Sequence, residues 1–127
     1  MAVIWGPKVG GKTGPMTEDD VLAFIISKAG QGSAIWQKNV RKCAQYVTGH
    51  RGAGGGSPLT HRGKTVFHTT EGAGADHVAM FFSCENGNIA SIIGVGSHAF
   101  GNNKTWYNLD WHLPGWHVNP QVGWGPK

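Results

Sequence analysis

The sequence has 127 residues, of which 39% are hydrophobic and 14% charged, and its formal net charge at pH 7 is +4. This length suits one compact domain over residues 1–127, and the apolar fraction excludes a wholly disordered chain. No apolar run approaches the roughly 18 residues of a membrane-spanning helix, and the first residues lack the charged start and apolar run of a signal peptide, so we expect a soluble protein.

Two helices are predicted in the first half of the chain. Residues 1–16 are rich in Gly and Pro and are predicted to be irregular. Thr17 is a favourable N-cap for a first helix because three acidic residues follow it, and Gly30 ends that helix. Ser33 then caps a second helix, whose apolar residues recur at steps of four, three and four along one face. These residues are Trp36, Val40, Cys43 and Val47.

The second half of the chain is predicted to form strands. Its β-branched and aromatic residues cluster in four runs separated by Gly- and Asn-rich breaks. The runs are residues 64–70, 77–83, 88–95 and 104–111. Residues 49–63 have the composition of a loop, and residues 113–127 are predicted to be irregular. The predicted fold class is therefore α+β, with two N-terminal helices packed on a four-stranded antiparallel β-meander.

Basic residues are concentrated between Lys38 and Lys64, a span without Asp or Glu. A block of one sign suits an anionic partner such as RNA, although a solvated surface has the same composition. His and Cys residues occur at no spacing typical of a metal site. We therefore predict neither a metal ion nor another cofactor.

Seven histidines in so short a chain suggest acid–base chemistry. Cleavage of RNA at its 2′-hydroxyl needs no metal, because one histidine can act as base and another as acid near neutral pH. The predicted catalytic residues, in or beside the strands, are His68, His77 and His98. The small residues before His98 predict an open surface, and a β-bulge there would direct its ring.

Cationic, hydroxyl and aromatic side chains would hold the RNA. Cations stabilise charge on the reacting phosphate, and aromatic rings stack on bases. The predicted substrate-binding residues are Arg62, Lys64, Thr70, Tyr107 and Trp106, and Trp111 is a further aromatic candidate for stacking.

The run "HVAMFFSCENGNIASIIGVGSHAFGNNKTWYNLDW", residues 77–111, resembles the meander of RelE- and barnase-like (colicin-type) bacterial RNase toxins. Within it, "IIGVGSHA…YNLDW" is similar to the RelE pattern of an apolar strand, Gly and His, followed by a strand that begins near a Tyr. The resemblance implies catalytic residues on the concave face of the sheet, with a role for His98 and for Tyr107. It also implies an effector delivered into the cytoplasm of a target cell. The producing cell would then need an acidic immunity protein to cover the basic site.

Two alternative functions remain open. "KCAQYV" and "DHVAMFF" resemble, over shorter stretches, the NlpC-type papain-like amidases, and this implies Cys43 as nucleophile and His77 as base. A reactive thiolate is favoured at a helix N-terminus, whereas Cys43 is predicted in the middle of a helix on its apolar face. The second alternative is a module that binds nucleic acid through its basic segment without cutting it.

Overall fold

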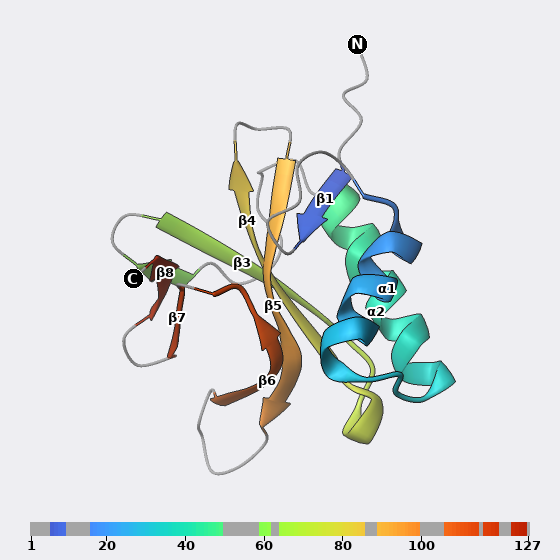
Figure 1. Ribbon diagram of the computed structural model, residues 1–127. Coiled ribbons are helices and arrows are strands. Elements are labelled where there is room, and N and C mark those ends of the chain that lie inside the picture. The colour runs from blue at the N-terminus through green and yellow to red at the C-terminus, as the bar shows by residue number, and fades with distance from the viewer. Residues whose placement is uncertain are drawn as a thin grey trace.

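The two helices lie on the same side of a six-stranded sheet, as Figure 1 shows. This computed structural model describes residues 6–9, 16–49, 59–61, 64–85, 89–99, 106–114, 116–119 and 123–126. The helices precede the antiparallel part of the sheet in the chain, so the predicted α+β fold class is confirmed.

Both helices begin where the sequence predicts. Helix α1 spans Glu18–Ala29, and the Thr17 hydroxyl accepts a hydrogen bond from the backbone N–H of Asp20 at 3.1 Å. The Asp20 carboxylate accepts one from the backbone N–H of Thr17, also at 3.1 Å, which completes a capping box. Helix α2 spans Ala34–Gly49, and the Ser33 hydroxyl accepts a hydrogen bond from the N–H of Trp36 at 3.0 Å. These N–H groups, two at the start of α1 and one at the start of α2, would otherwise lack partners within the helix.

Four strands form the predicted antiparallel meander. They are β3 (Lys64–Glu71), β4 (Val78–Glu85), β5 (Ile89–Ala99) and β6 (Trp106–His112), and each pairs with the next. Strand β5 continues four residues beyond its predicted end at Val95, because its pairing with β6 resumes after a register shift between Val95 and Gly96. The glycines therefore do not end β5. The pairing of β5 with β4 shifts between Phe81 and Phe82, which leaves Ile93 as an extra residue of β5 before His98.

Further strands lie in segments where none was predicted. Strand β1 (Gly6–Val9) runs parallel to the first part of β5, and β2 (Leu59–His61) pairs with β3. Strands β7 (Trp116–Asn119) and β8 (Gly123–Pro126) form a hairpin, and β8 contacts β2 and β3. These strands have three or four residues and contain Gly or Pro or lie beside them, so they lack a period-two pattern that local analysis could detect.

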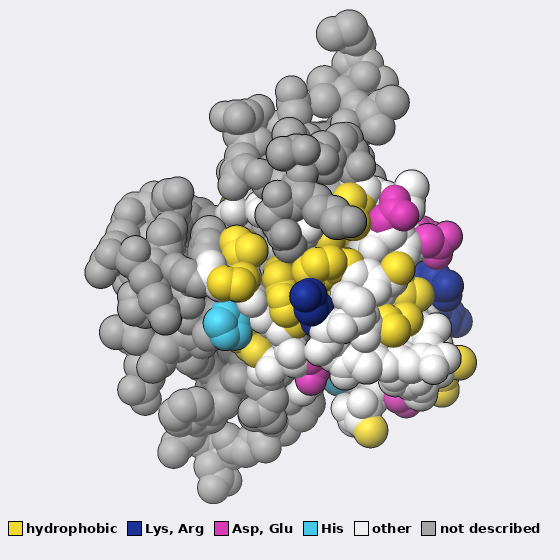
Figure 2. Space-filling view, viewed as in Figure 1, with side chains coloured by type: hydrophobic (Ala, Val, Ile, Leu, Met, Phe, Trp, Pro, Cys, Tyr) yellow, Lys and Arg dark blue, Asp and Glu magenta, His cyan; other side chains and the backbone are white. Residues whose placement is uncertain are grey.

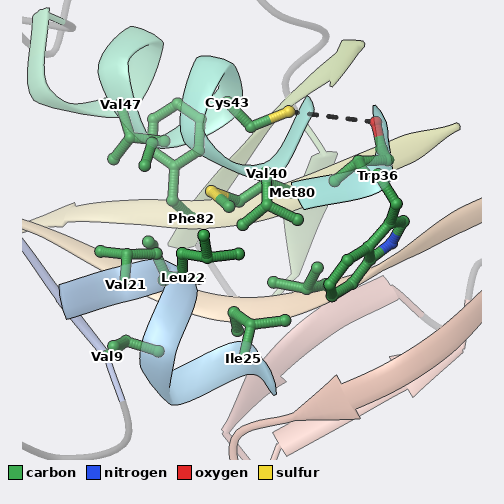
Figure 3. Close-up of a cluster of buried hydrophobic side chains, with 14 residues drawn as sticks. Val9, Val21, Leu22, Ile25, Trp36, Val40, Cys43, Val47, Met80 and Phe82 are labelled. Atoms are coloured by element: carbon green, nitrogen blue, oxygen red, sulfur yellow. Dashed lines mark hydrogen bonds between the residues drawn. The ribbon is translucent and has the colours of Figure 1, made fainter. Parts of the chain in front are cut away.

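The core lies between the helices and one face of the sheet. The four apolar residues predicted to share one face of α2 are at most 8% exposed; they are Trp36, Val40, Cys43 and Val47. They meet Val78, Met80 and Phe82, which alternate along β4 and belong to the same buried cluster. Met80 and Phe82 point toward the helices (Figure 3). Burying a side chain such as Phe82 contributes roughly 1.5–3 kcal/mol. Ala79 and Phe81 point the other way but are also fully buried, so β4 is the centre of the fold on both faces.

Candidate functional site

His77 lies directly before β4, after a short 3₁₀ turn, η1 (Gly74–Asp76). Its backbone N–H donates to the carbonyl of Gly74 at 3.2 Å, and the residue is only 7% exposed. Burial disfavours the charged imidazolium and lowers the pKa of His77 below its ordinary value. His77 is therefore neutral at pH 7, and a neutral ring can accept a proton.

His98 lies at the same end of the sheet as His77. Pairing between β4 and β5 ends at Ala79 and Gly96. His77 is two residues before Ala79 and His98 is two residues after Gly96, so each lies about 7 Å along its chain from this last pair. On the other edge of β5, His98 is paired with Tyr107 of β6 through the backbone. The register thus places His77, His98 and Tyr107 near one end of the meander.

Thr70 and His68 lie on β3 at different distances from this end. Thr70 is exposed and paired with Ala79, so it is in line with the last β4–β5 pair. His68 is two residues further from that end. Its ring is half-buried and stacks on Phe81, with the centroids 5.6 Å apart and the planes at 19°. His68 is thus part of the packing on the sheet face that points away from the helices.

The predicted cations are not brought to the histidine end by the described part of the chain. Lys64 begins β3, where it is paired with His61. Six residues of extended strand separate Lys64 from Thr70, a distance of about 20 Å. Arg62 lies outside the described residues. Trp106 is paired with Ala99 through the backbone, and the described side chains include neither Trp106 nor Tyr107.

Trp111 has a packing role at the junction of α1 and β6. Its ring meets Phe24 of α1 edge to face, with the centroids 5.1 Å apart, and both residues are half-buried. The Lys28 ammonium lies 5.6 Å from the centroid of the Phe24 ring. In the view of Figure 2, apolar side chains gather in the middle of the described surface, around a cationic side chain.

A hollow of about 240 Å³ opens between the α1–α2 loop, η1 and β6. Two carboxylates that the sequence analysis did not single out, Asp76 and Asp110, lie in its wall. Asp76 directly precedes His77, and Asp110 is the extra residue of the β5–β6 bulge. The described residues that line the hollow are Ala29, Gly30, Gly32, Ser33, Trp36, Ala75, Asp76 and Asp110. The hollow therefore adjoins the end of the sheet that carries the histidines.

The two carboxylates differ in their surroundings. Asp76 accepts a hydrogen bond from the Ser33 hydroxyl at 2.5 Å, and its backbone carbonyl accepts one from the Asn39 amide at 2.8 Å. These bonds fix η1, and hence His77, against the start of α2. Burial raises the pKa of Asp110 above its ordinary value. The described lining contains no Lys or Arg, so this hollow does not offer the basic surface that the sequence predicted.

A signal for Asp110 was present in the sequence but ambiguous. Asp110 stands between Leu109 and Trp111 in a predicted strand, where a lone acid usually marks the solvent-facing side. Asp110 is indeed exposed, and the sequence does not reveal that it is the extra residue of the bulge or that it lines a hollow.

Cys43 is fully buried on the core side of α2 (Figure 3). Burial, and next the negative charge of Glu71, raise the pKa of Cys43 to about 12. The thiolate is the nucleophile in cysteine catalysis, and almost none exists at neutral pH when the pKa is so high. The geometry at Cys43 therefore favours a structural thiol over the nucleophile of an amidase.

In the part of the chain that the structure describes, no three His, Cys, Asp or Glu side chains form a group that could hold a metal ion. No helix there is long and apolar enough to cross a membrane. No protein-family model, curated protein or solved structure matches this chain.

Proposed function

We propose that this protein is a metal-independent endoribonuclease that cleaves RNA through the 2′-hydroxyl. The observation that carries the proposal is the position of His77, which burial keeps neutral and which lies at the same end of the meander as His98. A neutral imidazole is the form that a general base requires.

In this mechanism His77 takes the proton from the 2′-hydroxyl, and the 2′-oxygen forms a bond to phosphorus. The bond from phosphorus to the 5′-oxygen breaks, and His98 in its protonated form gives a proton to that leaving oxygen. The products are a 2′,3′-cyclic phosphate and a free 5′-hydroxyl. In this proposal Thr70, which is exposed, donates a hydrogen bond to the phosphate, and Lys64 and Arg62 contact phosphates further along the RNA.

The net charge of +4 fits an RNA substrate, because phosphate contacts dominate the affinity of nucleic-acid-binding proteins. It also fits the role of a toxin whose producer makes an acidic immunity protein to cover the site, and which acts in the cytoplasm of a target cell. The amidase alternative is disfavoured by the high pKa of Cys43.

The test is cleavage of a labelled RNA, with an all-2′-deoxy oligonucleotide of the same sequence as substrate control. We expect wild-type protein to cut only the RNA, with undiminished activity in excess chelator. His77→Ala and His98→Ala should each lose at least about 100-fold in rate, the usual contribution of a general acid or base. His112→Ala is the matched control, because His112 is exposed on β6 and paired with Gly94, further from the site.

Three outcomes would contradict the proposal. Cleavage of the deoxy oligonucleotide would exclude 2′-hydroxyl chemistry, and full activity of folded His77→Ala and His98→Ala variants would remove both from the site. Binding of RNA without any cleavage would identify a nucleic-acid-binding module instead. Melting temperatures measured on the same samples separate loss of chemistry from loss of fold.

A further inference from the structure

Helix α2 carries a continuous exposed stripe outside the face that it buries in the core. The stripe residues follow one another at steps of three, four, three and one, which places them within about 100° of the helix surface. All five are exposed: Ile35, Lys38, Lys42, Gln45 and Tyr46. The α2 sequence contains no Asp or Glu. The stripe is thus purely cationic, with large apolar groups at its two ends.

Those two apolar groups are unusually open to solvent. Ile35 is 59% exposed and Tyr46 is 38% exposed. They are 11 residues apart, which corresponds to about 16 Å along the helix axis. The Tyr46 ring is held edge-on against Phe82, with the centroids 6.4 Å apart. A tyrosine that is already ordered loses little entropy on binding, and tyrosine is enriched among the residues that dominate interface energy.

The lysines between them are available to a partner. Within the described residues neither Lys38 nor Lys42 forms an ion pair, whereas Arg41 beside them binds the Asp19 carboxylate of α1 at 3.0 Å. The stripe therefore presents two positive charges that the described part of the protein does not neutralise. A complementary surface has carboxylates in the middle and apolar side chains at both ends.

We propose that this stripe docks an acidic amphipathic helix of a protein partner. A second helix fits because the stripe is straight and its residues have the three-and-four spacing at which helices pack side by side. Protein is favoured over nucleic acid by Ile35, because an aliphatic side chain gains free energy when buried against another apolar group and offers nothing to a phosphate. The inference does not rest on the proposed ribonuclease activity, since none of the stripe residues belongs to the histidine site.

The probe is a synthetic helical peptide of about three heptads, with leucines spaced to meet Ile35 and Tyr46 and glutamates between them. A control peptide has lysines in place of the glutamates. Fluorescence anisotropy of labelled peptide should show wild-type protein binding the acidic peptide at least about 10-fold more tightly than the basic one. The Lys38→Glu/Lys42→Glu variant should reverse that preference.

Two further variants distinguish peptide binding at the stripe from a general effect of the protein's net charge. Lys28→Glu changes an exposed lysine of α1 and should keep the preference for the acidic peptide. Ile35→Ser should weaken binding of that peptide by about 10-fold, the effect of losing one buried aliphatic contact. Circular dichroism checks that each variant is folded, which the exposure of the substituted residues leads us to expect.

The proposal is overturned if wild-type protein binds the two peptides equally. It is also overturned if the double lysine variant keeps the wild-type preference. Oligouridine binding as tightly as the acidic peptide, dependent on Lys38 and Lys42 but unaffected by Ile35→Ser, would assign the stripe to RNA instead.

Discussion

The sulfur of Cys43 lies 3.9 Å from the carbonyl oxygen of Thr69 and 4.0 Å from that of Val78, so one side chain of α2 reaches two neighbouring strands. Thr69 is in β3 and Val78 is in β4. A thiol is large and weakly polar enough to bridge these distances while it fills apolar space. Cys43 therefore packs α2 against the first residue of β4, which directly follows His77.

Replacing Cys43 by serine should lower the free energy of unfolding by about 1–3 kcal/mol, because a hydroxyl is smaller and both carbonyls are too distant to accept a normal hydrogen bond from it. RNA cleavage by the folded variant should be unchanged. Denaturant titration and the cleavage assay on one preparation measure both effects. A stable Cys43→Ser variant without activity would favour the amidase mechanism.

Gly32, in the loop before α2, and Gly74, in η1, provide a matched pair. Both have a φ of 64°, a conformation that costs residues with a Cβ about 1–2 kcal/mol. A Cβ at Gly74 would meet nothing within 4 Å, whereas one at Gly32 would overlap the Trp36 ring. Gly74→Ala should therefore show only the conformational cost, and Gly32→Ala should lose roughly 1–3 kcal/mol more. Equal losses in urea titrations of the two variants would show that Trp36 moves aside freely.

His77 should make stability fall as the solution becomes acidic. Its folded-state pKa is below the ordinary value of 6.5, so the unfolded chain binds a proton first as pH falls. The contribution of His77 to the free energy of unfolding is fully present above pH 6.5. It is lost as pH falls from 6.5 through the lowered folded-state pKa. His77→Gln should flatten this part of the curve when denaturant midpoints are compared from pH 7.5 down to pH 5.

Asp110 changes the pH dependence of stability in the opposite direction. Because its pKa is raised in the folded state, its contribution to stability is present in acid and is lost as pH rises through the folded-state pKa. Because Asp110 is present in both proteins, its effect cancels in the difference between wild type and His77→Gln. An identical pH dependence in the two proteins would mean that His77 titrates alike in the folded and unfolded states.

The sequence by itself determined the elements whose signals are local. The caps at Thr17 and Ser33 interact with residues three positions away, and the Trp36–Val47 stripe repeats within one helix. The four strands of the meander could be predicted because each has its own run of β-branched and aromatic residues. Each histidine of the proposed site could also be named in advance, since the chemistry of imidazole does not depend on the fold.

Tertiary structure alone decided which of those residues lie together. Strand β1 exists only because residues 89–92 of β5 offer it an edge, and no pattern within β1 records that distant partner. In the same way the β4–β5 register, not any motif, places His77 and His98 at the same end of the sheet. Lys64, the first residue of β3, lies at the other end of that strand from Thr70. Asp110 is the extra residue of the β5–β6 bulge and lines a hollow, and both facts appear only in the folded structure. Register is fixed by the summed packing of both sheet faces, so a single side chain carries almost no information about it.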